Sequence, residues 1–330
     1  MSERPNNYDI EVVTGPCSVD LELKRNLSGY YNLADMRVRN MHGEMQRGVY
    51  GTRVVPLKSR TIVKKDGTGM GVDFKHYFTV EEDIVVIRNP LPVDPPPGVV
   101  AAERIVKDTG LLVATEIMMP HIQLPYYENR IPSGKFLEWQ PSVEGLGYPH
   151  LTMGEYARRN GWLHGIKNPK NLDVPLDTAN NSDENVSSAL QRQWSGLASF
   201  AQIPGNQIIF IHRGVDSPEN RTWRSAPVHE IARKTKHSVP GAKLYFDPSH
   251  SCGPKLRDKV VETTIAAMKM QDGNNWLYDG ILIEAGNSIT DTDQHISHEE
   301  LQGLLDELAK FRNLREPEAI EPKIHQGVRF

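Results

Sequence analysis

The sequence is poor in cysteine and has no long apolar run. Its two cysteines, Cys17 and Cys252, cannot build a disulfide framework, which fits a reducing compartment. No apolar stretch approaches the roughly 20 residues that a membrane-spanning helix needs. Residues 1–7 lack the apolar core of a signal peptide, so we expect no secretion. These absences together predict a cytoplasmic protein without a membrane partner.

The sequence also lacks an excess of positive charge and a glycine-rich phosphate fingerprint. The net charge is −4 and no basic block occurs, so nucleic acid is not an expected partner. No glycine-rich fingerprint follows an apolar run, which argues against a doubly wound nucleotide-binding fold. The 330 residues, 38% hydrophobic and 24% charged, have a composition typical of a globular enzyme with a large core.

What the sequence does contain is a series of short apolar runs that end in polar residues. Such runs favour buried parallel strands. The predicted strands are Ile10–Ser18, Thr52–Thr61, Leu111–Ile117, Phe136–Pro141, Trp162–Asn168, Gln207–Gly214, Lys243–His250 and Gly280–Gly286. Helical spacing predicts helices in the intervals, at Val99–Thr109, Leu151–Asn160, Ser187–Ala201, Pro227–Lys236, Lys255–Met270 and His298–Phe311.

This alternation of strand and helix predicts an α/β protein with a (β/α)8 TIM barrel. We expect a single domain over residues 1–330. The stretch 62–97 holds an extra apolar run and a proline-rich segment. We interpret it as a loop inserted after strand two, at the barrel mouth, with room for a short hairpin. A two-domain doubly wound fold is the weaker alternative.

Barrel enzymes carry their active sites at the carboxyl ends of the strands. A thiolate, an imidazole and two carboxylates fall there, from Cys17, His250, Glu284 and Asp291. That mixture suits a divalent transition metal (Mn, Fe, Co or Zn) better than Mg or Ca. Cys17 could instead be a buried thiol, and Asp291 a surface carboxylate. Glu284 is harder to explain otherwise, because a carboxylate within an apolar strand needs a partner.

Cationic side chains form a second set at the same strand ends. Such groups bind phosphate and carboxylate, and the set comprises Arg53, Lys58, Arg60, Lys167 and Arg213. A metal beside an anion pocket predicts a phosphorylated or carboxylated substrate whose carbonyl the metal polarises. Lys58 and Arg60 could instead form an ion pair or contact on the surface, and Lys167 could be a solvated strand end. His212, next to Arg213 in the sequence, is interpreted as a core histidine.

Six short motifs occur in order along the chain: Gly15-Pro16-Cys17-Ser18, Arg53 with Lys58-x-Arg60-Thr61, Gly165-x-Lys167-Asn168, Arg213-Gly214, Asp247-x-Ser249-His250, and Glu284. In this order they resemble the metal-dependent 3-deoxy-D-arabino-heptulosonate 7-phosphate (DAHP) synthases and the related 3-deoxy-manno-octulosonate 8-phosphate synthases. The likeness spans about residues 10–295. Any one motif alone is a weak signal, whereas six in order are a specific one.

The resemblance implies a metal site and a set of substrate contacts. The family's metal ligands carry over to Cys17, His250, Glu284 and Asp291, with Asp293 as a rival for the last because the loop Thr290–Gln294 matches the family only imperfectly. Phosphoenolpyruvate (PEP) would be bound by Arg53, Lys58, Lys167 and Arg213. The aldose phosphate would contact Arg60 and Thr61. Cys17, His250 and Lys58 would be catalytic, Lys58 as a proton donor.

The reaction implied is an aldol-type condensation of PEP with an aldose phosphate, erythrose 4-phosphate being favoured. It yields DAHP and inorganic phosphate, a transferase step of the shikimate pathway to aromatic amino acids, and a homo-oligomer is expected. One alternative is a relative in secondary metabolism with a different aldose or donor. Others are a metal-free Schiff-base aldolase acting through Lys167, and a barrel that binds a sugar acid or phosphate without turnover.

Two departures from the family pattern affect the cationic set. Ser59 stands where the family has proline between the lysine and the arginine. The fourth strand ends in the segment Trp139–Glu144, where the family usually has an arginine for the PEP phosphate. Losing one such contact costs on the order of 1.5–3 kcal/mol unless another residue replaces it. Arg130 and Arg88 are the candidates for that replacement.

Overall fold

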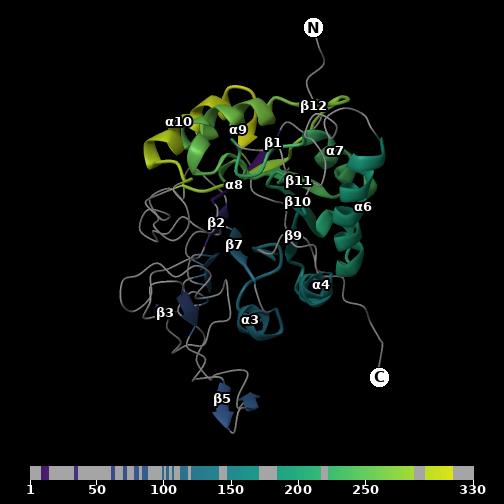
Figure 1. The fold of residues 1–330 in the computed structure, drawn as a ribbon, viewed down its shortest axis with the longest axis vertical. Coiled ribbons are helices and arrows are strands. Elements are labelled where there is room, and N and C mark those ends of the chain that lie inside the picture. Colours follow the sequence, from purple (N-terminus) through teal and green to yellow (C-terminus); the bar gives the residue numbers. More distant parts are fainter. Residues whose placement is uncertain are drawn as a thin grey trace.

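The chain forms an α/β fold around a curled parallel sheet (Figure 1). The computed structural model describes residues 9–14, 33–35, 61–63, 70–72, 78–81, 84–87, 99, 102–103, 106–107, 112–117, 120–140, 147–170, 184–216, 222–285 and 294–314. The predicted α/β class is confirmed. The curled sheet is compatible with a TIM-like fold.

Nine strands make up the main sheet, in the order β14-β11-β10-β9-β8-β7-β2-β1-β15. They are β1 (Asp9–Thr14), β2 (Leu33–Asp35), β7 (Leu112–Glu116), β8 (Phe136–Trp139), β9 (Leu163–Lys167), β10 (Ile208–His212), β11 (Lys243–Phe246), β14 (Gly280–Ile283) and β15 (Asn313–Leu314). Every pairing among them is parallel, and β14 pairs with both β11 and β1. All their carboxyl ends therefore meet at one edge of the sheet.

The second strand of this sheet differs from the predicted one. Thr61, expected to end that strand, begins β3, which belongs to an antiparallel pair outside the main sheet. The sheet uses β2 instead, and a strand of three residues gives almost no periodic signal in the sequence. Residues 52–60 lie outside the described part of the chain. Within the stretch 62–97 two antiparallel pairs are described, formed by β3 (Thr61–Val63) with β4 (Met70–Val72) and β5 (Phe78–Glu81) with β6 (Ile84–Ile87).

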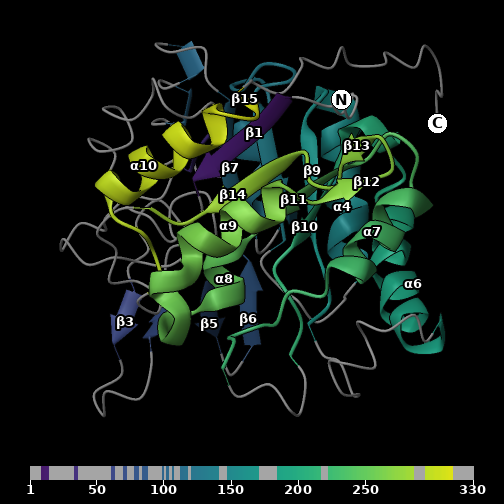
Figure 2. The ribbon, with the colours of Figure 1, turned by 90° about the horizontal axis from the view of Figure 1, so that it is seen from above.

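Side chains alternate between the two faces of the main sheet, as the pleat of a strand requires. One face buries a cluster that includes Val13, Leu137, Trp139, Ile211, Tyr245 and Leu282. The other face packs against helices that lie around the outside of the sheet (Figure 2). These helices are α4 (Tyr148–Asn160), α6 (Glu184–Ala201), α7 (His229–Ser238), α9 (Val260–Met268) and α10 (His298–Ala309).

Local signals in the sequence account for the ends of these helices. Gly161 adopts a left-handed conformation with φ of 67° and ends α4, the conformation that a glycine accepts at least cost. Ser297 and Glu300 form a capping box at the start of α10. The predicted helix at Val99–Thr109 is described at residues 99, 102, 103, 106 and 107, all helical. No helix in the described part of the chain has the length and apolar character that crossing a bilayer requires.

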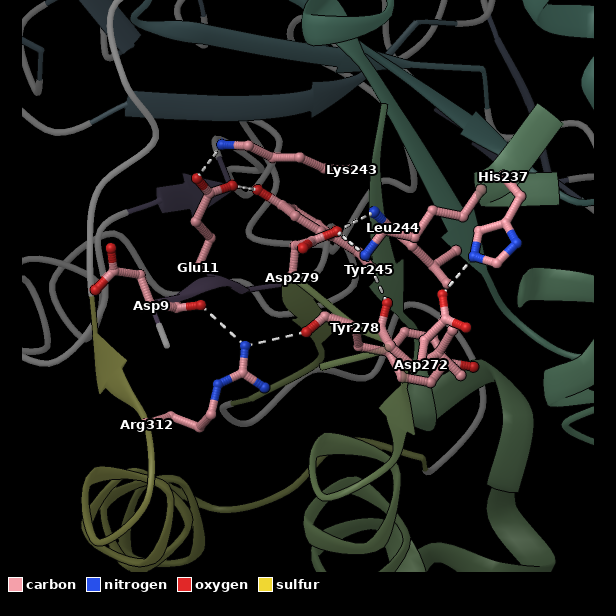
Figure 3. Close-up of polar contacts among 12 residues, drawn as sticks. Asp9, Glu11, His237, Lys243, Leu244, Tyr245, Asp272, Tyr278, Asp279 and Arg312 are labelled. Atoms are coloured by element: carbon pink, nitrogen blue, oxygen red, sulfur yellow. Dashed lines mark hydrogen bonds and ion pairs between the residues drawn. The ribbon is translucent and has the colours of Figure 1, made fainter. Parts of the chain in front are cut away.

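The amino ends of the strands are held by a polar cluster around Glu11 (Figure 3). Its carboxylate accepts hydrogen bonds from the ammonium of Lys243 and the hydroxyl of Tyr245. A Cβ on Gly280 would lie 2.6 Å from the Tyr245 ring, so glycine at this position makes room for that ring. Nearby, the buried Arg312 donates to the backbone carbonyls of Asp9 (2.9 Å) and Tyr278 (3.0 Å) and ties β15 to its neighbours.

Candidate active site at the carboxyl ends of the strands

The segment after β11 places His250 on a short helix. Asp247 caps this helix, α8 (Pro248–Cys252), and its side chain accepts a hydrogen bond from the His250 backbone N–H at 3.1 Å. Pro248 occupies the first helical position, where a missing N–H has no cost. The predicted strand Lys243–His250 was too long, because β11 ends at Phe246 and Asp-Pro starts a helix here. The cap fixes the imidazole one turn above the strand end.

Each ring nitrogen of His250 faces a buried carboxylate. Nδ1 lies 2.8 Å from Oδ2 of Asp247, and Nε2 lies 3.4 Å from Oε1 of Glu284. Burial alone would raise the pKa of Asp247, but His250 and Lys167 outweigh it through charge and hydrogen bonding, so that pKa lies below its usual value. Asp247 is therefore an anion that orients the imidazole through Nδ1. A carboxylate that orients a histidine in this way is the usual support of a metal-binding imidazole.

Glu284 follows β14 directly and is buried, with 1% of its surface exposed. Its backbone N–H donates to the hydroxyl of Ser249 at 3.0 Å, which ties the end of β14 to α8. Its Oε2 accepts from the side-chain amide of Gln294 at 3.0 Å. Its Oε1 has no hydrogen-bond partner among the described residues. A buried carboxylate oxygen that faces an imidazole nitrogen and lacks a donor is suited to a cation between the two.

Two buried cations lie at the ends of the neighbouring strands. Lys167 ends β9 and Arg213 follows β10, with 3% and 8% of their surfaces exposed. Asn168 joins these ends, because its Oδ1 accepts from the Arg213 backbone N–H and its Nδ2 donates to the Gly214 carbonyl, both at 2.8 Å. Gly214 has φ of +87°, and a Cβ there would meet the Ser225 carbonyl at 2.1 Å. The Lys-Asn and Arg-Gly motifs thus form one cross-strand unit.

The end of β8 carries an indole where the resemblance would place an arginine. The centre of the Trp139 ring lies 5.8 Å from the Lys167 ammonium, within cation–π range. Arg130 does not fill the missing place, because it precedes β8 at the amino end of the strand and pairs with Glu103 at 2.9 Å. Arg88 lies outside the described residues. Among the described residues, the surroundings of the Lys167 ammonium are therefore aromatic on the β8 side.

Several predicted site residues fall outside the described part of the chain. These are Cys17, Arg53, Lys58, Arg60, Asp291 and Asp293. Thr61 lies on β3, away from the main sheet. Within the described residues no three His, Cys, Asp or Glu side chains are arranged to hold a metal. An ion between His250 and Glu284 would therefore need further ligands from the undescribed segments, as the predicted roles of Cys17 and Asp291 require.

The structure gives roles to two residues that the sequence analysis named only as parts of motifs. Asp247 orients His250, and Gln294 binds Glu284. Asp247 could have been found, since Asp-Pro is a recognisable helix start. His212 lies behind the sheet, where its Nδ1 contacts the Tyr278 hydroxyl at 2.7 Å. Burial lowers the pKa of His212 well below its usual value, in keeping with its interpretation as a core histidine.

Four of the predicted site residues thus come together on consecutive strands of the sheet. They are Lys167, Arg213, His250 and Glu284, from the ends of β9, β10, β11 and β14. The grouping combines a buried histidine–carboxylate pair with two buried cations. The chain matches no protein-family model and has no significant match among curated proteins.

Proposed function

We propose that this chain is an enzyme that condenses PEP with an aldose phosphate, with the help of a divalent transition metal. The observation that carries the proposal is the placement of the His250–Glu284 pair beside Lys167 and Arg213 at one edge of a parallel sheet. A carbonyl electrophile and an anionic donor need these two kinds of group side by side.

The strand pairings support a complete barrel as the scaffold of this site. Eight strands from β1 to β14 pair in sequence order, and β14 pairs back to β1 with Val13 opposite Leu282. We infer from this ring that the fold is a (β/α)8 barrel. Active sites of such barrels lie at the carboxyl ends of the strands, where the four residues are found.

The residues present fit a transition metal. His250 offers Nε2, oriented through Nδ1 by Asp247, and Glu284 offers the unpartnered Oε1. Cys17 and Asp291 are the proposed remaining ligands. When bound, a divalent ion would supply Lewis-acid polarisation of the aldehyde carbonyl.

The remaining steps belong to side chains of the chain itself. Lys167 and Arg213 bind the carboxylate and phosphate of PEP as preorganised cations. The PEP methylene carbon forms a bond to the aldehyde carbon, and Lys58 gives a proton to the new alkoxide. Water adds at C2 of the former PEP, and cleavage of the C2–O bond releases inorganic phosphate.

Phosphate release from PEP in the presence of a panel of aldoses and aldose phosphates tests this proposal. We expect release with at least one phosphorylated aldose, loss of release after chelation, and recovery on adding Mn²⁺, Co²⁺ or Zn²⁺. The Lys167→Met variant should raise the KM for PEP about tenfold or more. Lys170→Met is the matched control, because Lys170 is half-exposed and pairs with Asp216 at 3.1 Å. Release that persists after complete metal removal would refute the metal role.

One observation favours a second candidate, a Schiff-base aldolase. The Lys167 ammonium lies buried beside Trp139 and interacts with Asp247, and an aromatic, partly desolvated setting is typical of imine-forming lysines. Borohydride reduction in the presence of pyruvate would then link the substrate to Lys167 covalently. Mass spectrometry that finds no adduct on Lys167 would exclude this candidate.

The Trp139 ring is also consistent with a condensation that uses a different donor or aldose. Trp139 offers a ring, not a guanidinium, at the end of β8. A donor with less negative charge near the end of β8 would lose no binding energy when a tryptophan stands in place of the arginine. A panel that includes donors without phosphate therefore distinguishes DAHP formation from a related reaction of secondary metabolism.

A further inference from the structure

Gln294 links Glu284 to an arginine far away in the sequence. The Gln294 side chain is fully buried, and its amide nitrogen donates to Oε2 of Glu284 at 3.0 Å. Its amide oxygen accepts a hydrogen bond from the guanidinium of Arg224. Because the arginine donates to the oxygen of the amide, the amide nitrogen has to face the glutamate. Arg224 thus fixes which way Gln294 is turned.

Arg224 is itself anchored to the helix that carries His250. Its backbone N–H donates to the carbonyl of Cys252 at 3.3 Å, at the end of α8. A Cβ on Gly253 would approach the Cβ of Arg224 to 2.3 Å, so the arginine packs directly against the backbone after this helix. The next residue, Ser225, exchanges hydrogen bonds with Ser251 at 3.0 and 2.8 Å. Arg224 therefore fastens the Glu284 carboxylate and the His250 helix to one another.

This link leaves Glu284 with one oxygen for a ligand. Oε2 accepts from the Gln294 amide, whereas Oε1 lies 3.4 Å from Nε2 of His250 and has no hydrogen-bond partner within the part of the chain that the structure describes. A carboxylate that offers one oxygen suits a small ion with four to six ligands. Ca²⁺ takes six to eight oxygens and often binds both oxygens of a carboxylate.

We propose that Gln294 and Arg224 are positioning residues that restrict Glu284 to ligation through a single oxygen, and that this restriction makes the site select compact transition ions over Ca²⁺. The inference rests on the metal site of the proposed function. It adds two residues that do not touch the ion and strengthens the preference for transition ions that the ligand types already favour.

Titration calorimetry of the metal-free full-length protein with Mn²⁺ and with Ca²⁺ tests the inference without any substrate. We expect Gln294→Ala to weaken Mn²⁺ binding about 10- to 100-fold, the usual effect of removing a partner of a metal ligand. The Ca²⁺ affinity should stay or rise, so the Mn²⁺/Ca²⁺ ratio falls at least about tenfold. Arg224→Gln should shift the ratio in the same direction by a smaller factor.

Arg257→Gln is the matched control. Arg257 holds the same segment by donating to the His295 carbonyl at 3.0 Å and to Glu300, and these contacts do not involve Glu284. The Mn²⁺/Ca²⁺ affinity ratio of the Arg257→Gln variant should stay within about threefold of the wild-type ratio. Equal losses for both ions in all three variants would reduce the link to a structural role and overturn the inference.

Gln294→Glu keeps the size of the side chain and serves if the alanine variant does not fold. It replaces the amide donor with an oxygen, so we expect Ca²⁺ affinity to rise relative to Mn²⁺. An unchanged ratio in this variant contradicts the inference while the metal site itself stands. A wild-type protein that binds neither ion overturns the metal site and the inference together, so the two failures are distinguishable.

Discussion

Two buried glutamates stand at opposite ends of the same curled sheet, and their surroundings differ in one respect. Glu11, at the amino end, accepts hydrogen bonds from both Lys243 and Tyr245. Glu284, at the carboxyl end, has one oxygen bound by Gln294, and no described residue donates to the other. A carboxylate whose oxygens both find partners inside the protein holds the fold together. One that keeps an oxygen without a donor is prepared for a ligand.

A third buried glutamate shows that a missing partner is not sufficient for a site. No residue in the described ranges donates a hydrogen bond to either oxygen of Glu138, and Nδ1 of His164 lies 3.7 Å from one of them. Burial raises the pKa of Glu138 well above its usual value. Glu284 lies at the same sheet edge as the buried cations Lys167 and Arg213, whereas Glu138 faces a histidine whose pKa is lowered by burial and by the charge of His150. The neighbouring charges therefore separate a candidate ligand from a neutral acid.

Removing the Glu284 carboxylate should give the largest effect of all. If the proposed metal site is right, we expect Glu284→Gln to lower the rate of phosphate release from PEP by about 100-fold or more, because the proposed ion would lose a ligand. Metal content after dialysis should fall in parallel. The stability in urea should change little or rise, because Gln cannot leave a buried charge unpaired. A variant with normal metal content and a normal rate would remove Glu284 from the site.

Removing the Glu11 carboxylate should lower stability and leave metal content and rate unchanged, the opposite of the Glu284 variant. Glu11→Ala takes a partner from Lys243 and from the buried hydroxyl of Tyr245, and we expect a loss of about 2–4 kcal/mol in the free energy of unfolding. Metal content and the rate at low temperature should stay near those of the wild type. Glu155→Ala is the control, because this exposed carboxylate only pairs with Arg159 along one helix. Lost activity without lost stability would erase the contrast between the two ends.

The resemblance selected Glu284, but the apolar runs alone do not separate it from Glu138. Both lie in apolar runs, Phe136–Pro141 and Gly280–Gly286, and both patterns read as a carboxylate inside a buried strand. What differs is position. Glu138 lies within β8, opposite His164 of β9, whereas Glu284 comes just after β14 and contacts Ser249 near the start of α8. The face and depth of a side chain follow from strand register, which a single apolar run does not determine.

The main strands could be predicted because their apolar runs are long enough to carry a period. The strand β2 could not, since it has three residues. The contacts around Gln294 could not be predicted from the sequence either, because Arg224 lies 70 residues from Gln294 and contacts it only in the folded chain. Local signals therefore gave most of the strands and four converging site residues. The supporting contacts depend on tertiary packing.

Glu138 can be used to sharpen the comparison through stability. The pKa of Glu138 in the folded protein lies above the unfolded value of 4.5. Its contribution to the free energy of unfolding is therefore fully present below pH 4.5 and is lost as the pH rises. Glu138→Gln removes that loss. We expect the free energy of unfolding to rise by about 1–3 kcal/mol at pH 7–8 and to be unchanged near pH 4. Urea unfolding at several pH values measures it. A destabilised variant at neutral pH would mean that Glu138 is charged and paired with a protonated His164.

The smallest expected effect comes from the histidine that completes this cluster. Nδ1 of His150 lies 2.9 Å from Nε2 of His164, and burial lowers the pKa of His150 to about 4. A base with a depressed pKa gives stability that is complete above pH 6.5 and is lost as the pH falls toward 4. His150→Gln should therefore flatten the dependence of unfolding free energy on pH in this window, by about 1–2 kcal/mol at pH 5. His121→Gln, at an exposed position of α3 (Pro120–Tyr127), should leave the slope as it is. If the slope between pH 4 and 6.5 is the same in both variants, the pKa of His150 is not lowered by folding and the expected effect is refuted.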